Sequence, residues 1–264
     1  MSIERQYKIR KYDSAALRKF GVLAFALALG GCGLTTTRID AKDERVFLPA
    51  FRVGINLNDG KQAAAEPQSG HAFEIGATRV RGSGGQSLAA GQTPIIYGNS
   101  TFTAPAQLTN DFDYGFGDIS WRWRKFFDDR ALGLEVTAGV GYSSLDLSVS
   151  SPALIASDHF FTRGPHAGLG LIWRLNQSAS FQGRIGSFIS PAEYGVTSLS
   201  RYELSYAQAL FDNVSLRAGY AGWDVYGQTG YGSSNFKLNF SGPVVSLNWD
   251  FSVNNRKIIV KREE

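Results

Sequence analysis

One segment alternates between two classes of side chain along its whole length: Ala131-Leu-Gly-Leu-Glu-Val-Thr-Ala-Gly-Val-Gly-Tyr-Ser143. Even positions are apolar, whereas odd positions are mostly glycine or polar. A strand turns successive side chains to opposite faces, so this pattern predicts a β-strand with one apolar face. About eleven residues at ~3.3 Å each, tilted by ~40°, cover ~25–30 Å, which is the height of the apolar band of a transmembrane β-barrel.

The same alternation recurs in seven further segments. In each, one face is apolar and the other mixes glycine with polar or charged residues, which suits the crowded lumen of a narrow barrel. We therefore predict an all-β chain that forms an antiparallel up-and-down transmembrane β-barrel of eight strands within residues 70–251. The seven segments are 73–77, 119–123, 163–175, 179–185, 202–210, 214–220 and 243–251.

A ninth candidate strand, Ala50–Asn58, does not fit this count. An up-and-down barrel with both termini on one side needs an even number of strands. Either this segment is an extra piece within the linker 32–69, or it pairs with a strand hidden in 94–104 and the barrel has ten strands. The alternation also slips near Gly117, Ser143 and Ser241, where we expect β-bulges.

The connections predict the direction of the strands. Three are short (127–130, 176–178 and 211–213) and four are longer (82–111, 149–159, 190–199 and 227–235). Outer-membrane barrels have short periplasmic turns and longer outer loops. Aromatic residues then fall at two levels, as expected of two membrane interfaces. The periplasmic belt is Trp121, Trp123, Trp173 and Trp249, and the opposite belt is Tyr142, Tyr202 and Tyr220 with Tyr114, Phe116 and Phe161.

Residues 1–31 have the layout of a helical secretory signal peptide, with a basic start and an apolar run from Phe20 to Gly31. This run is shorter than the ~20 residues that a membrane helix needs. Leu29-Gly30-Gly31-Cys32 resembles the lipobox of bacterial lipoproteins. The resemblance implies that Cys32 becomes an acylated N-terminus, and Gly33 after it indicates the outer membrane. Ordinary signal cleavage near Ala28 is the alternative.

The charge of the chain belongs to this leader. The whole sequence has 27 Lys and Arg against 23 Asp and Glu. The leader holds six and two of these, so residues 32–264 carry 21 of each sign and have no net charge. A basic surface for nucleic acid is therefore not expected. The single cysteine and three scattered histidines predict neither a metal site nor a cofactor.

Together these features resemble the family of small outer-membrane barrels (OmpA-, OmpX- and PagL-like). The resemblance is architectural and covers about 70–251. Val245–Phe251 is similar to the C-terminal assembly signal of such barrels, although Ser252–Glu264 follow it as a periplasmic tail. The resemblance implies outer-membrane lipids and the outer-membrane assembly machinery as partners. It also implies a lipid-anchored N-terminus on the periplasmic side.

The non-lipid face of the strands holds the candidate functional residues. Unpaired charges in a narrow lumen cost several kcal/mol, so a buried network of ion pairs is the preferred interpretation. The excess of arginine leaves a narrow path for small polar or anionic solutes as an alternative. The predicted lumen residues are Glu74, Arg122, Arg124, Glu135, His166, Arg174, Arg184, Arg201, Glu203, Arg217 and Asp250.

An enzymatic role is the third hypothesis. Lipid A deacylases of the small-barrel type use His, Ser and an acid near the outer rim. Asp158-His159 lies at a loop edge with Ser151 and Ser157 nearby, but the family's His-x-Ser spacing is absent. We therefore predict a non-enzymatic, lipid-anchored outer-membrane barrel with a structural or surface-interaction role. A soluble periplasmic barrel is a fourth possibility.

Overall fold

The computed structural model describes residues 38–43, 46–57, 69–127, 131–211, 213–230 and 235–252. The expected signal peptide, Cys32 and the tail beyond Ser252 lie outside these residues. The described part is all-β, with no helix in it. In the same part of the chain, no helix is long and apolar enough to cross a membrane.

Each of the eight predicted segments coincides with part of a strand to within one residue, and the ninth candidate overlaps β2 from Ala50 to Asn56. The strands are longer than the sequence pattern suggested, because they continue past the point where the alternation slips. Their bounds are β1 Arg38–Asp43, β2 Leu48–Asn56, β3 Gly70–Leu88, β4 Ile95–Tyr97, β5 Ser100–Phe102, β6 Ala106–Phe126, β7 Leu132–Ser150, β8 Ile155–Arg174, β9 Ala179–Ile189, β10 Gly195–Phe211, β11 Val214–Gln228 and β12 Asn235–Ser252.

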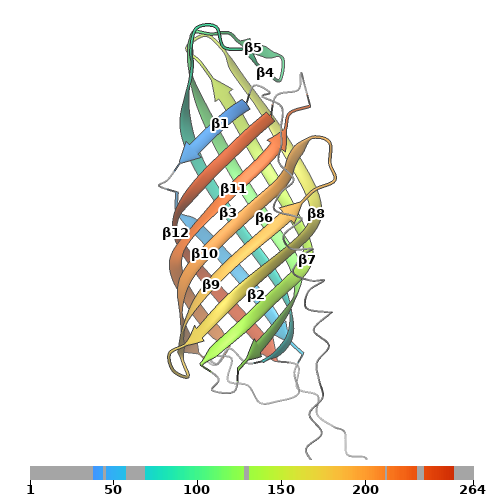
Figure 1. Cartoon of the computed structure of the whole chain (residues 1–264), viewed down its shortest axis with the longest axis vertical. Coiled ribbons are helices and arrows are strands. Elements are labelled where there is room, and N and C mark those ends of the chain that lie inside the picture. Colours follow the sequence, from blue (N-terminus) through green and yellow to red (C-terminus); the bar gives the residue numbers. More distant parts are fainter. Residues whose placement is uncertain are drawn as a thin grey trace, which may run out of the picture. The chain divides into compact units, whose positions relative to one another are not determined.

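The main sheet closes into a ring (Figure 1). Its order is β1-β12-β11-β10-β9-β8-β7-β6-β3-β2, and β2 also pairs with β12. Ten strands therefore form the sheet, and nine of them, all but β1, form the closed circuit. Eight strands was the wrong count. The alternative of ten strands agrees with the number of strands in the sheet. The pairing that we expected, between Ala50–Asn58 and a strand in 94–104, does not occur, because β4 and β5 (95–102) pair only with each other.

Because the number of strands in the circuit is odd, the two strands that close it must run parallel. Neighbours in the circuit are antiparallel except β2 and β12, which run parallel from Leu48↔Val244 to Asn56↔Ser252. Nine alternating strands must begin and end in the same direction, so this pair cannot be antiparallel. Arg38, which pairs with Asn235, therefore lies at the opposite end of the ring from Ser252. The two ends of the sheet are not on one side, contrary to expectation.

β1 and β2 both pair with β12, and their registers on it differ by one residue. Asp43 pairs with Phe240 and Leu48 pairs with Val244, so five steps on one side match four on β12. Val46, between the two strands, is buried, and its carbonyl oxygen lies only 1.8 Å from where a Cβ on Gly242 would stand. Only glycine fits there, because any side chain would overlap this backbone.

At the edge of β1 that pairs with no strand, a side chain of β3 forms hydrogen bonds with the backbone groups. The Asp40 backbone amide donates to Gln86 Oε1 at 3.1 Å, and Gln86 Nε2 donates to the Arg38 carbonyl at 2.8 Å. Asn110 Nδ2 donates to the Asp40 carbonyl at 2.6 Å. The amide of Gln86 thus replaces the neighbouring strand that β1 lacks on this side, which satisfies backbone groups that would otherwise be unpaired.

The two faces of the sheet exchange polarity partway along the strands. On β7, residues 132–142 turn apolar side chains outward and Glu135 inward, whereas Leu145, Leu147 and Val149 point inward and Asp146 points outward. We call the part level with 132–142 the band and the part level with 143–150 the extension.

No bulge accompanies this exchange. The pairings of β3, β6, β7 and β8 run without a register shift through Gly117 and Ser143, and those of β11 and β12 run through Ser241. The slips in the sequence pattern are therefore one boundary seen on several strands. Gly117 pairs with Tyr142, so the boundary lies in the same ladder row on these two neighbouring strands.

The extension holds the hydrophobic core. Aromatic rings from β6, β11 and β12 stack across it, with Trp223 6.1 Å from Phe240 and 5.6 Å from Phe116 between ring centroids. Tyr114 and Phe116 are buried in this core. Their expected place in an outward aromatic belt was wrong, because both lie on the extension side of the boundary, where the apolar face is the inner one.

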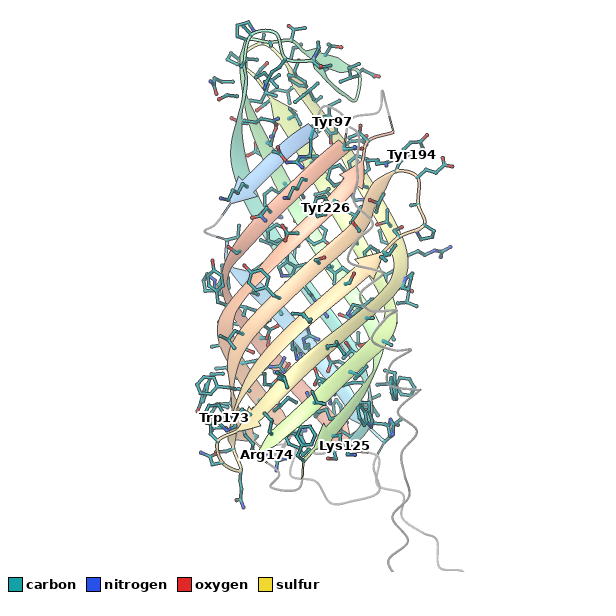
Figure 2. The ribbon with its side chains drawn as sticks, viewed as in Figure 1. Tyr97, Lys125, Trp173, Arg174, Tyr194 and Tyr226 are labelled. Carbon is teal, nitrogen blue, oxygen red and sulfur yellow. The ribbon has the colours of Figure 1, made fainter. Side chains whose placement is uncertain are left out.

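The connections differ from expectation on the extension side. β3 and β6 extend into the predicted loop 82–111, and β4 and β5 form a small hairpin between them. Ser151 N donates to the Leu154 carbonyl at 2.8 Å, which closes β7 and β8 by a short turn in place of a long loop. Tyr97 lies at this end of the ring, and Trp173, Arg174 and Lys125 lie at the other (Figure 2). The buried hydroxyl of Tyr97 donates to the Leu147 carbonyl at 2.7 Å.

Candidate functional site

The inner face of the band gathers the predicted lumen residues. All eleven point inward, and most are nearly inaccessible to solvent. Sequence reasoning missed two members, Arg52 and Asp118. Arg52 lies on β2, which the even strand count had excluded, and Asp118 was assigned to a bulge. Both residues stand at inward positions of the period-two pattern of their strands, and this position could have identified them from the sequence.

Glu74 on β3 is the centre of one ion-pair cluster. Its Oε1 accepts from Arg52 Nη1 at 2.5 Å, and its Oε2 accepts from Arg122. Arg122 Nη2 lies 3.2 Å from Asp250 Oδ1 on β12. Four strands (β2, β3, β6 and β12) therefore meet in this cluster, which spans the parallel closing pair from the inside.

Glu135 on β7 is the centre of a second cluster. Arg124 Nε lies 2.5 Å from its Oε2, and Arg184 Nη2 lies 2.9 Å from its Oε1. Both arginines come from other strands, β6 and β9. The carboxylate is 2% exposed, so it depends on these two guanidinium groups in place of water.

Two looser pairs complete the interior of the band. Arg201 Nη2 lies 3.0 Å from His166 Nε2, and its Nη1 lies 3.9 Å from Asp118. The Arg201 guanidinium also lies 5.6 Å from the rings of Phe116 and Trp223, where the polar interior meets the core. Arg217 on β11 has only a 3.8 Å pair with Glu203 Oε1.

The interior contains more positive than negative charge. Among the described inward side chains of the band, seven arginines (52, 122, 124, 174, 184, 201 and 217) face five carboxylates (74, 118, 135, 203 and 250), an excess of two. A cavity of about 40 Å³ lies between Arg52, Arg184, Arg201 and the aromatic core. A cavity of this size holds a few water molecules, and buried polar groups such as these guanidinium groups commonly form hydrogen bonds with water.

The outer face of the band carries the predicted aromatic residues. Trp173 and Trp249 lie toward the tight-turn end, as do Trp121 and Trp123, which are half-buried by their neighbours. Tyr142, Tyr202 and Tyr220 lie at the boundary with the extension, and all three are exposed. The two groups are therefore at opposite edges of the band.

The outer face of the extension contains a polar groove of about 640 Å³ across β3, β6, β7 and β8. Its central row is set by the register: Arg81 pairs with Asp113, Asp113 with Asp146, and Asp146 with His159. Arg79 and Arg81 share the carboxylate of Asp113, with contacts of 2.6–2.8 Å.

His159 has a different acidic partner from the one expected. Its Nδ1 lies 2.6 Å from Asp146 Oδ1 on the neighbouring strand, whereas Asp158 accepts only the backbone amide of His159. Ser157 lies two residues away on the same outward face and also lines the groove. Among the described residues, no group of three or more His, Cys, Asp or Glu side chains could hold a metal ion.

Comparison with known proteins identifies no relative: no family, no curated protein and no solved structure matches this chain.

The Glu135 cluster gives a test of the interior. Glu135→Gln removes the one carboxylate that Arg124 and Arg184 share, so two buried guanidinium groups lose their counter-charge. We expect a loss of about 3–5 kcal/mol in the free energy of unfolding, measured by urea denaturation of the full chain in lipid vesicles.

Asp40→Asn is the matched control, because the Asp40–Arg38 pair has side chains almost half exposed. Exposed pairs contribute less than about 1 kcal/mol. Equal losses in the two variants would contradict the buried network as a source of stability.

Proposed function

We propose that this chain is an outer-membrane β-barrel with a closed interior, whose extension projects from the membrane in a structural or surface-interaction role. The observation that carries the proposal is the exchange of polarity between the faces at one common height. In the band, large apolar side chains such as Leu169 and Ile185 are more than half exposed. A protein in water rarely exposes so continuous an apolar surface.

The dimensions of the two zones support the same conclusion. The band spans residues 132–142 on β7, a height of ~25–28 Å at ~3.3 Å per residue and ~40° tilt, which matches the apolar core of an outer membrane. The extension adds residues 143–150, or ~20 Å. Its inner face is apolar and its outer face polar, as expected of a β-structure surrounded by water.

The packing of the interior argues against the alternative of a pore for polar or anionic solutes. In the band, charged side chains of neighbouring strands form ion pairs within the lumen, and Arg201 on β10 reaches to 3.9 Å from Asp118 on β6, four places away in the ring. In the extension, Trp223, Phe240 and their neighbours fill the ring with hydrocarbon. An ion entering from the extension side would have to pass this core, where an unpaired charge costs many kcal/mol.

The ring topology also bears on the position of the N-terminus. If the tight turns are periplasmic, as in barrels of this type, then Arg38 enters the sheet from the cell surface and Ser252 ends in the periplasm. Cys32, outside the described residues, precedes Arg38 by six positions. We therefore favour a lipid anchor at the outer leaflet, in place of the periplasmic side that an even strand count implies.

Single cysteines test this orientation. Arg38→Cys and Gln177→Cys place thiols at opposite ends of the ring, on β1 and in the tight turn between β8 and β9. We expect a membrane-impermeant maleimide to label Arg38→Cys on intact cells, and Gln177→Cys only after permeabilisation, with the wild-type chain as background. The reverse pattern would invert the orientation.

An arginine pair tests whether the band faces lipid. Leu169 lies near mid-height of the band on β8, and Ser157 lies outward on the same strand in the extension. Leu169→Arg should lower the free energy of unfolding in vesicles by about 2–4 kcal/mol, because a charge at the bilayer midplane is costly. Ser157→Arg should change it by less than about 0.5 kcal/mol. Similar small effects of both would mean that the band is in water.

The pair of Asp146 and His159 favours a second candidate function, hydrolysis of a lipid ester at the rim. An acid that orients a histidine beside a serine is the arrangement of nucleophilic catalysis. Ser157 is the serine nearest in sequence on the same face, and no hydrogen bond between Ser157 and His159 occurs in the described structure. The dyad is also largely exposed, which is the ordinary state of a surface ion pair.

Lipid A mass spectrometry tests this candidate. Cells that express the wild-type chain are compared with cells that express His159→Ala or Ser157→Ala. If the site is hydrolytic, a deacylated lipid A species should appear with the wild-type chain and be lost in both variants. Identical spectra from all three strains and from cells without the protein would reject hydrolysis.

A further inference from the structure

The upper part of β8 has a neighbouring strand on only one side. Its pairing with β7 continues up to Ile155, whereas its pairing with β9 begins at His166↔Phe188. Within the described sheet, the segment Ile155–Pro165 therefore pairs with no strand on the β9 side. Figure 1 shows β8 rising past the end of β9. This part of the extension thus contains a free strand edge.

The hydrogen bonds of β8 show which backbone groups face this edge. In an antiparallel pair, the N–H and C=O of every second residue point away from the partner strand. The Arg174 N–H donates to the Ala131 carbonyl, on the β7 side, whereas the Arg163 carbonyl accepts from Ser190 Oγ on the other side. Even-numbered residues of β8 therefore bond to β7, and odd-numbered residues face the free edge. The odd-numbered residues of its upper part are Ile155, Ser157 and His159.

Few groups of the protein cover this edge. Asp158 Oδ1 accepts the His159 N–H at 2.8 Å. Gly195, at the start of β10, lies beside the side chains of Phe160 and Thr162 and bounds the edge from below. Among the described residues, none forms a hydrogen bond from that side with the backbone of Ile155 or Ser157 or with the His159 carbonyl. At the edge of β1, by contrast, Gln86 bonds to the backbone groups.

The side chains along the free edge differ from those on the neighbouring strand. Ile155 is 74% exposed and Phe161 is 64% exposed, with Ser157 and His159 between them on the same face. On β7, the outward residues of the extension are only serine and aspartate. An exposed strand edge with apolar side chains beside it is a template for pairing with another chain.

From this edge we infer that the extension binds an extended segment of another protein, which adds as a strand beside Ile155–His159. In this mode of recognition, backbone hydrogen bonds supply affinity and the side chains at alternate positions supply specificity. The partner strand places an apolar side chain beside Ile155 and polar side chains beside Ser157 and His159. On binding, its backbone carbonyl displaces Asp158 from the His159 N–H.

A second copy of this chain does not fit the same edge within one membrane. Two antiparallel copies of β8 are related by a two-fold axis perpendicular to the sheet. For the wall of a barrel this axis lies in the membrane plane, so the second barrel would be upside down. Rotation about the membrane normal keeps both barrels upright, but it joins the inner face of one wall to the outer face of the other. This step rests on the proposed function, because it needs a barrel that spans a membrane.

The experiment measures binding of a synthetic strand to the full chain in detergent micelles, by fluorescence anisotropy. The probe is a labelled seven-residue peptide of alternating threonine and valine, and its control is the same peptide methylated on its backbone nitrogens. We expect the wild-type chain to bind the first peptide and not the second, because methylation removes the backbone donors. Equal binding of both peptides would overturn the inference in favour of apolar attraction.

Ser157→Pro tests the position of the site. Proline removes the N–H of residue 157, and Pro165 already occupies an odd-numbered position of β8. We expect about tenfold weaker binding of the peptide, since one hydrogen bond is lost and a carbonyl of the peptide is left unpaired. Ser157→Ala is the matched control, because it keeps the N–H, and it should bind as the wild-type chain does. Wild-type affinity in Ser157→Pro would show that this edge is not the site.

Hydrogen exchange tests the same site without a substitution. The peptide should slow the exchange of the backbone N–H groups of Ile155 and Ser157 in the wild-type chain. Unchanged exchange at both positions would overturn the inference. Dimers of the wild-type chain that exclude the peptide would also overturn it, because the occupant of the edge would then be a second copy.

Failure of this inference is distinguishable from failure of the proposed function. If the peptide does not bind, while Leu169→Arg destabilises the protein in vesicles, then the edge site is wrong and the membrane assignment stands. If the peptide binds at the edge and Leu169→Arg is harmless, then the edge site stands and the membrane assignment is wrong.

Discussion

The parallel pair of β2 and β12 is the constraint on which the rest of the structure depends. A strand with an unpaired edge exposes a row of N–H and C=O groups, which can pair with another chain. The pairing of Leu48–Asn56 with Val244–Ser252 removes both edges of the sheet at once. Because it joins residues near the two ends of the described chain, no shorter piece of the sequence can close the ring.

This closure organises the interior of the band. Glu74 accepts from Arg52 on one side of the closing pair and from Arg122, which reaches Asp250 on the other side. The Glu135 cluster joins β6, β7 and β9 in the same way. Most of these ion pairs join strands that are neighbours or next neighbours in the sheet, whereas the pair of Arg122 and Asp250 crosses the closing strands and forms only when the ring is closed.

The exchange of polarity gives the two halves of the ring different partners. In the band, the outer face is apolar and exposed, and the inner face carries charge. In the extension, the inner face is a hydrophobic core and the outer face is polar, and the parallel entry of β1 places Arg38 beside that core.

Strand identity could be predicted from the sequence, because a period of two in side-chain polarity is a local property. The alternation in 131–143 and its seven counterparts placed eight strands correctly and turned Glu135, His166 and the other lumen residues inward. It also gave the outward faces of Tyr142, Trp173 and Trp249. The same local reasoning erred at Gly117, Ser143 and Ser241, where a change of environment was interpreted as a change of register.

What the sequence by itself determined is therefore which residues of a strand share a face, since that follows from strand geometry alone, whereas Tyr114 and Phe116 were assigned to the wrong face. Only the tertiary structure decided the number of strands, the parallel closure by β2 and the meeting of Glu74 with Arg52 and Arg122. The closure depends on pairing between residues nearly two hundred positions apart, and the contacts of Glu74 join residues 22 and 48 positions apart, which no local pattern encodes. The boundary between band and extension depended on both. The sequence showed a break in the alternation on several strands, and the register of the strands showed that these breaks form one continuous boundary.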